Sequence, residues 1–187
     1  MYNTSDIRKG LKIELDGKPW NIVYFQFVKP GKGTAFTRTK IKSLLTGNVI
    51  DRTFRSGDKL VPADVEDHDM QYLYNDGEDY FFMNTETFAQ VPIPGKVLGK
   101  DTDFLMDEMT VQVLFYKGNP VNIELPNFVE LEITYREPGV KGNTAQGATK
   151  PATLSTGAIL QVPLFVKNET WIKIDTRTRE YVERVNR

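Results

Sequence analysis

Turn signals interrupt this chain at intervals of roughly 8–12 residues. Gly, Pro, Asn and Asp residues at these places separate short segments that are rich in Val, Ile, Phe, Tyr and Trp. Such segments are typical of β-strands, and no stretch has the 3.6-residue apolar period of a long helix. The pattern predicts an all-β fold. Three small barrels fit the turn spacing better than one large sandwich does.

Two places in the expected middle part depart from simple strands. Pro92 and Pro94 predict an irregular segment over residues 91–95, because proline cannot donate to a strand ladder. Residues 103–109 predict a short helix. Tyr72 and Tyr74 are expected on one face of their strand. The predicted strands are residues 7–15, 20–28, 35–43, 49–54, 70–74, 79–83, 110–116, 121–125, 129–135, 158–166, 171–174 and 180–185, with a long loop over 137–150.

Charge is distributed unevenly along the sequence. Residues 1–63 hold 12 lysines and arginines against five acidic residues, residues 64–127 hold three against 13, and residues 128–187 hold nine against seven. A split of this kind indicates parts with different partners. We therefore expect domains over residues 1–63, 64–127 and 128–187. The first is suited to phosphates, and the second to solvent or a basic protein surface.

A loop rich in glycine and lysine follows the second predicted strand and predicts a hairpin tip. Its glycines can take positive φ and leave Lys32 without bulky neighbours. In the next strand one aromatic and three basic residues recur at every second position and so share a face. This arrangement is typical of polyanion binding, and the alternative is a solvated turn above the wet side of a sheet. The loop residues are Lys29, Pro30, Gly31, Lys32 and Gly33, and the face residues are Phe36, Arg38, Lys40 and Lys42.

Composition excludes several kinds of site. The chain has no cysteine, which rules out disulfides, cysteine metal sites and thiol nucleophiles. His68 is the only histidine, so a Ser-His-Asp site would have to use it. No apolar run approaches the roughly 20 residues that span a bilayer, and the N-terminus has no targeting pattern. We expect a cytoplasmic protein with no metal, no other cofactor and no membrane partner.

Two other functions compete with polyanion binding at the tip. Asp76, Glu78 and Asp79 cluster, as do the carboxylates of residues 101–108, and paired carboxylates serve glycoside hydrolysis or hold hard cations. The first cluster occupies a turn and the second the start of the predicted helix, so we expect no enzyme. A generic RNA-binding module is the other alternative, although the acidic second domain would interrupt a continuous basic groove.

Motifs along nearly the whole chain resemble bacterial elongation factor P. The tip loop, with Ala35, Phe36 and Arg38 behind it, is similar to the tip of that family. Further similar segments follow in the same order as in the family. These are residues 53–57, 72–77, 82–88, 126–131, 150–157 and 161–166.

The resemblance implies an SH3-like, or KOW-like, first domain followed by two OB-fold domains in an L-shaped, tRNA-like arrangement. It implies a monomeric, non-enzymatic translation factor that binds both ribosomal subunits between the peptidyl and exit sites, beside peptidyl-tRNA. There it stimulates peptide bond formation and relieves stalling at consecutive prolines. A paralogue that acts on other stalled messages is a close alternative.

The resemblance also assigns roles to particular residues. Lys32 matches a position that carries a post-translational extension in many members, which implies a lysine-modifying enzyme as a partner. Tyr181 and Arg184 match positions that face tRNA, and we expect Arg38, Lys40 and Lys42 to contact RNA phosphate. The loop residues Gly142, Asn143 and Thr144 match the loop of the family that faces mRNA. Asn143 stands there in place of the usual aspartate.

Two further positions depart from the family pattern. Asn168 and Arg179 stand where the family commonly has glycine. Asparagine tolerates left-handed backbone, but arginine adopts it less readily. We therefore expect the final turn to differ in detail.

Overall fold

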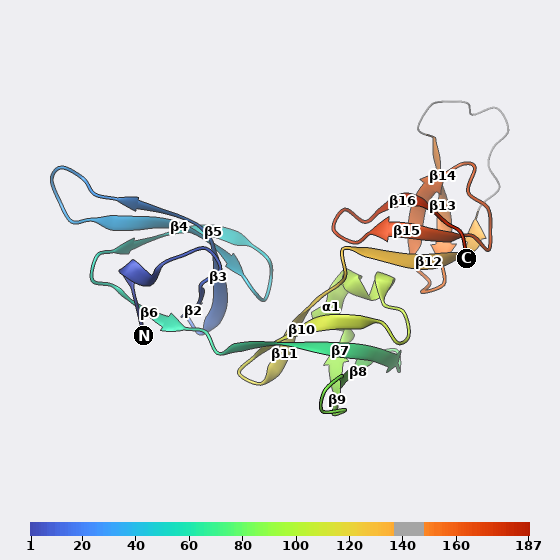
Figure 1. Cartoon of the computed structure of the whole chain (residues 1–187), viewed down its shortest axis with the longest axis horizontal. Helices are drawn as coiled ribbons and strands as arrows, with labels where there is room; N and C mark the ends of the chain where they lie inside the picture. The colour runs from blue at the N-terminus through green and yellow to red at the C-terminus, as the bar shows by residue number, and fades with distance from the viewer. Residues whose placement is uncertain (137–147) are drawn as a thin grey trace. The chain divides into compact units, whose positions relative to one another are not determined.

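The computed structural model describes residues 1–136 and 148–187 (Figure 1). These residues form three antiparallel sheets, one turn of α-helix and two 3₁₀ turns. The all-β fold class is therefore confirmed. None of the helices in the described ranges is long and apolar enough to cross a membrane. The helical segments are α1 (Gly95–Leu98) and the 3₁₀ turns Thr4–Asp6 and Gly99–Phe104.

The first sheet has six strands in the order β1-β6-β2-β3-β4-β5. Ile13, Ile22 and Ile41 are wholly buried at its centre. Figure 1 shows the β3–β4 hairpin extending beyond the other strands of this sheet. The strands are β1 (Tyr2–Asn3), β2 (Lys12–Leu15), β3 (Lys18–Val28), β4 (Phe36–Ser43), β5 (Val49–Arg55) and β6 (Lys59–Pro62).

The predicted strand over residues 7–15 is wrong in its first half. The 3₁₀ turn and a second turn precede β2. In that second turn Gly10 has a φ of 91°, and the Leu11 amide donates to the Arg8 carbonyl at 3.2 Å. Positive φ does not fit an extended strand, so regular pairing starts only at Lys12.

The second sheet has the order β11-β10-β7-β8-β9, so β9 is an edge strand. The prediction of an irregular segment at residues 91–95 is wrong, because β9 pairs with β8 along its whole length. Proline is tolerated there because an edge strand needs donors on one side only. The strands are β7 (Val65–Asn75), β8 (Asp79–Asn84), β9 (Gln90–Pro94), β10 (Thr110–Tyr116) and β11 (Asn119–Glu124).

The predicted helix over residues 103–109 is also wrong. The helical turns end at Phe104, and Leu105 is extended. The Glu108 amide then donates to the Tyr72 carbonyl, and the Tyr72 amide donates to the Met109 carbonyl, both at 2.8 Å. Backbone groups that a helix would pair locally are thus used by β7.

A bulge in β7 separates the two tyrosines that the alternation placed on one face. The register with β8 shifts between Tyr72 and Tyr74. Tyr72 is 2% exposed, whereas Tyr74 is 52% exposed. The extra residue, Leu73, reverses the facing of Tyr74, as β-bulges do.

The third sheet has the order β14-β13-β12-β15-β16 around a core that includes Leu131, Ile133 and Ile172. The sequence prediction missed β13, which contains Pro151. The predicted loop over residues 137–150 is described only from residue 148, and Thr149 and Lys150 belong to β13. The strands are β12 (Phe128–Arg136), β13 (Thr149–Leu154), β14 (Ile159–Pro163), β15 (Trp171–Asp175) and β16 (Glu180–Val185).

Packing divides the chain into two compact units. The first is Met1–His68 with Val113–Asn122, and the second is Asp69–Gln112 with Ile123–Arg187. The first unit thus contains the first sheet and the turn between β10 and β11. The division into domains 1–63, 64–127 and 128–187 stays a prediction.

Candidate functional site

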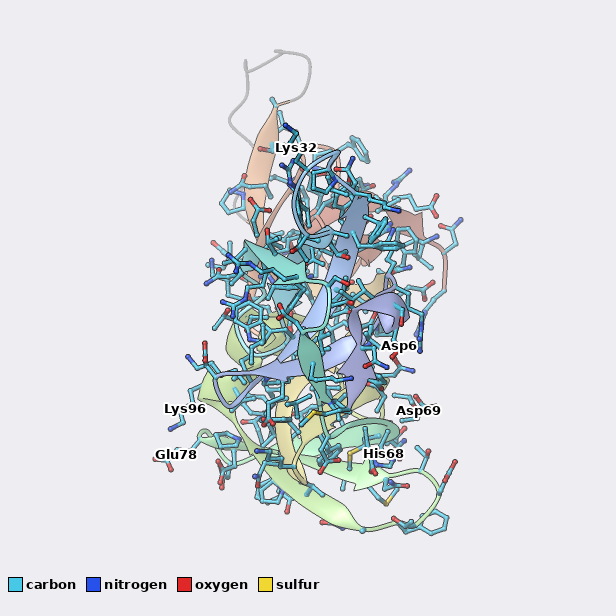
Figure 2. All side chains as sticks on the ribbon, turned by 90° about the vertical axis from the view of Figure 1, so that its left-hand side faces the viewer. Asp6, Lys32, His68, Asp69, Glu78 and Lys96 are labelled. Atoms are coloured by element: carbon cyan, nitrogen blue, oxygen red, sulfur yellow. The ribbon has the colours of Figure 1, made fainter. Side chains whose placement is uncertain are left out.

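The hairpin predicted from the glycine-rich loop is present. Strands β3 and β4 pair as far as Val28 and Phe36, and the loop between them carries Lys32. Figure 2 shows Lys32 at the end of this hairpin, far from Asp6 in the same unit. Gly33 has a φ of 106°, which side-chain-bearing residues rarely adopt, so glycine suits this place. The tip therefore presents an exposed lysine on a short turn.

Strand β4 is two-faced, as its alternation predicts. Thr37, Thr39 and Ile41 are at most 4% exposed, and Ser43 is buried with them. The opposite face is the basic face, where the basic side chains are exposed and Phe36 is half-buried. The residues of the basic face are Phe36, Arg38, Lys40 and Lys42.

Neighbouring strands add groups to the basic face that the sequence analysis missed. Arg55 of β5 lies opposite Phe36 in the register, and the Arg38 guanidinium lies 5.5 Å from the centre of the Phe36 ring. Two shallow cavities open here, of about 320 and 330 Å³. Their linings place hydroxyl, aromatic and cationic groups together, which suits an RNA surface. The side chains include Tyr24, Gln26, Thr34, Phe36, Arg38, Lys40, Asp51, Thr53 and Arg55.

The two predicted RNA contacts near the C-terminus lie on β16, in the second unit. Tyr181 is half-buried against the core of the third sheet, and burial raises the pKa of its hydroxyl. Arg184 is exposed, and its guanidinium lies 5.4 Å from the centre of the Phe165 ring. The predicted mRNA-facing residues Gly142, Asn143 and Thr144 lie outside the described residues.

Two of the carboxylates that suggested an enzyme, Asp76 and Asp103, have structural partners. Asp76 accepts hydrogen bonds from the amides of Asp79 and Glu78, at 2.8 and 3.0 Å, and these bonds lower the pKa of Asp76. Asp103 pairs with Arg179 at 2.6 Å. His68 contacts Glu66 at 3.1 Å. In residues 1–136 and 148–187, no three His, Asp or Glu side chains are grouped so that they could hold a metal ion.

Arg179 occupies the backbone conformation expected of glycine. Its φ is 61°, and its amide donates to the Asp175 carbonyl at 2.8 Å. In the turn that contains Asn168, the positive φ of 59° belongs to Glu169 instead.

Three family models match consecutive parts of the chain. They are "Elongation factor P (EF-P) KOW-like domain" over residues 3–60, "Elongation factor P (EF-P) OB domain" over residues 65–123, and "Elongation factor P, C-terminal" over residues 129–184. A structure described as eukaryotic translation initiation factor 5A from Methanococcus jannaschii superposes with a TM-score of 0.54 at 21% identity. It covers 66% of this chain and 91% of that one, a likeness of fold alone.

Whole-chain relatives agree with these models. Elongation factor P of Moorella thermoacetica is 53% identical over 184 residues, covering 98% of this chain and 100% of the relative. Elongation factor P of Acetivibrio thermocellus is also 53% identical, and the match covers 99% of this chain and 100% of the relative. That of Mycolicibacterium smegmatis is 48% identical, covering 100% of both.

A KOW-like domain with a basic hairpin, followed by an OB domain, defines a translation factor and not an enzyme. The chain belongs to the elongation factor P family. Elongation factor P stimulates peptide bond formation and relieves stalling at consecutive prolines. Membership implies that the protein binds the ribosome.

Proposed function

We propose that this protein binds between the peptidyl and exit sites, in contact with both ribosomal subunits, and that Lys32 acts at the acceptor end of the peptidyl-tRNA. The observation that carries the proposal is the shape of the β3–β4 hairpin. An exposed lysine tops a strand whose one face is basic and whose other face is buried. Such a hairpin can enter a narrow space lined by phosphates while the first sheet holds it rigid.

The protein is proposed to act by positioning the tRNA end for reaction. The ring of proline restricts the backbone, so a prolyl peptidyl-tRNA is a poor donor and an incoming proline a poor nucleophile. Holding two reactants in a productive pose can lower a barrier by several kcal/mol, with upper limits of about 7–11 kcal/mol in well-oriented systems. Lys32, lengthened by a post-translational extension, would order the tRNA end without donating or accepting a proton.

The other predicted residues have supporting roles in this proposal. Pro30, Gly31 and Gly33 shape the tip, and the cations beside it bind phosphate. The second unit contributes further RNA contacts, and the protein acts as a cytoplasmic monomer of three domains, 1–63, 64–127 and 128–187. Its partners are the ribosome, peptidyl-tRNA, mRNA and a lysine-modifying enzyme. The contacting residues are Lys29, Arg38, Lys40, Lys42, Tyr181 and Arg184 for RNA, and Gly142, Asn143 and Thr144 for mRNA.

The test is reconstituted translation of a message that encodes consecutive prolines, with native protein or its Lys32→Ala variant. We expect rescue by the native protein only, and no effect on a proline-free message. Equal rescue by both proteins would remove Lys32 from the mechanism. No rescue by native protein of verified intact mass would contradict the proposed function.

A further inference from the structure

A polar cluster joins the end of the β10–β11 hairpin to the first sheet, and all of it lies within the first unit. The Lys117 ammonium lies 2.8 Å from the carboxylate of Glu14 in β2. The Tyr116 hydroxyl donates to the same carboxylate and lies 3.2 Å from the Gly17 carbonyl oxygen. The Lys117 ammonium also lies 5.3 Å from the centre of the Tyr116 ring. These three residues, Glu14, Tyr116 and Lys117, form the latch.

The latch differs from an ordinary surface ion pair. The Glu14 side chain is only 21% exposed. A carboxylate that is shielded from water and held by two donors contributes more than a solvated pair does. The contact between Tyr116 and Glu14 joins residues that are 102 positions apart in the sequence. The latch is therefore a tertiary contact and does not follow from the local turn chemistry of either hairpin.

The backbone leaves the first sheet through a short connection. Strand β6 ends at Pro62, and β7 begins at Val65. The Asp64 carbonyl in this connection accepts from the Lys117 amide at 3.0 Å. A connection of this length can act as a hinge, because a few φ and ψ angles absorb a rotation. The latch attaches the first sheet at a second place, on β2, and two attachments oppose rotation about either one.

The β3–β4 hairpin turns a small rotation at its base into a large movement at its tip. The ladder of β3 with β2 ends at the pair Lys12–Asn21, and β3 continues from there to Val28. At about 3.3 Å per residue this length is roughly 23 Å, so a rotation of about 3° at the base moves the end by roughly 1 Å. Misplacement by about 1 Å can slow a reaction about 100-fold. The position of Lys32 is therefore sensitive to looseness at the base of the first sheet.

We propose that Glu14, Tyr116 and Lys117 are positioning residues for peptide bond formation at prolines. The latch fixes the first sheet on the β10–β11 hairpin, and the β3–β4 hairpin then presents Lys32 in one direction. The inference rests on the proposed function, because it needs Lys32 to act at the tRNA end. The latch residues belong to β2 and the β10–β11 hairpin and not to the tip or the basic face, so they act through the first sheet.

Reconstituted translation of a message that encodes consecutive prolines, over a range of factor concentrations, tests this role. Tyr116→Phe removes one hydroxyl, and Lys117→Met removes the ammonium. We expect each to lower the maximal rate by about threefold to tenfold, while the half-saturating concentration changes by less than about twofold. The control Ile7→Val trims the core of the first sheet, so it should lower the thermal midpoint and keep the native maximal rate. Native maximal rates for both latch variants, or an equal loss in the control, would overturn the proposal.

Charge reversal tests whether the contact itself sets the rate. Glu14→Lys alone and Lys117→Glu alone each place like charges together, so each should lower the maximal rate at least as much as Lys117→Met does. The double variant restores opposite charges and should regain at least about half of the native maximal rate. A double variant as slow as the slower single variant would overturn the latch.

Lys32→Ala separates the latch from the proposed function. Lys117→Met added to Lys32→Ala should cause no further loss of rate, because the latch acts only through Lys32. A further loss as large as in the native background would overturn the latch. Equal rescue by Lys32→Ala and native protein would instead contradict the proposed function. Loss of rescue in Lys32→Ala together with native rates in the latch variants contradicts only the latch.

Discussion

The guanidinium of Arg179 donates a hydrogen bond to the carboxylate of Asp103, with 2.6 Å between Nη2 and Oδ2. It also donates to the Lys100 carbonyl at 3.3 Å and lies 4.6 Å from the centre of the Phe104 ring. Phe104 is itself buried in the core of the third sheet. One side chain from the turn before β16 therefore fastens the segment Gly99–Phe104 to the third sheet, and these contacts offset the left-handed backbone of Arg179.

Arg179→Ala should lower the free energy of unfolding by about 1–2 kcal/mol. It removes a half-exposed ion pair and a cation–π contact, each worth roughly 0.5–1 kcal/mol, and it keeps the strained φ. Arg179→Gly should lower the free energy of unfolding by less than Arg179→Ala does, because glycine relieves roughly 1 kcal/mol of the backbone strain at the positive φ. Urea denaturation of both variants measures their free energies of unfolding and so shows which variant is the more stable. A glycine variant less stable than the alanine variant would contradict this prediction.

The pairing of Arg179 with Asp103 should appear as coupling in a double-mutant cycle. Asp103→Ala and Arg179→Ala together should destabilise the protein by less than the sum of the single changes, with a difference of at least about 0.5 kcal/mol. Additive effects would mean that the ion pair contributes nothing to the free energy of unfolding and that Arg179 stabilises the protein through its packing on Phe104.

Lys150→Met should destabilise the third sheet by about 2 kcal/mol or more. Lys150 is 4% exposed, and its ammonium donates to the carbonyls of Leu164 and Val166 at 2.6 and 2.7 Å. Methionine fills the space but leaves the buried Val166 carbonyl and the part-buried Leu164 carbonyl without the ammonium donor. A buried acceptor that loses its donor costs roughly 1–3 kcal/mol. Chemical denaturation measures the loss, and the exposed Lys167→Met serves as the control. Equal stability of the two variants would show that water replaces the ammonium.

Acid should weaken the first unit through Glu14. The Glu14 carboxylate accepts a hydrogen bond from Lys117, at 2.8 Å, and another from the Tyr116 hydroxyl, and these bonds lower the pKa of Glu14 below its ordinary value of 4.5. The unfolded chain therefore takes up the proton first. The stabilisation is complete above pH 4.5 and is lost as the pH falls from there through the lowered pKa.

Carbon-detected NMR titration of the Glu14 carboxyl measures the shift. Stability measured against pH should lose its Glu14 component in the Glu14→Gln variant. A Glu14 pKa at or above its ordinary value would refute the expected hydrogen bonding.

Arg38→Ala and Lys40→Ala should weaken ribosome binding and reduce its dependence on salt. Each phosphate contact that is lost should lower the slope of log K against log salt by about 0.7–0.9. Lys18→Ala, at an exposed lysine elsewhere in the first sheet, is the matched control. If Arg38→Ala has the same slope as Lys18→Ala, the Arg38 side chain is only solvated.

Local sequence patterns were sufficient to predict the structure where residues that are neighbours in sequence are also neighbours in space. The tip loop and the two faces of β4 followed from turn residues and a period of two. Prediction from the sequence failed where the hydrogen-bond partners of a segment come from a strand that is distant in the sequence. Glu108 and Met109 bond to Tyr72 of β7 instead of continuing a helix, and β9 accepts its prolines because it lies at an edge.

The sequence by itself determined the all-β class, the exposed Lys32 tip and the separation of charge, because turn chemistry, strand alternation and net charge are local properties of the chain. Only the tertiary structure decided that Arg55 joins the basic face, that Tyr74 turns outward to stack on Phe81, and that Arg179 reaches Asp103. These contacts depend on strand register, on a bulge and on a left-handed residue, and each of them relates residues that no local pattern connects.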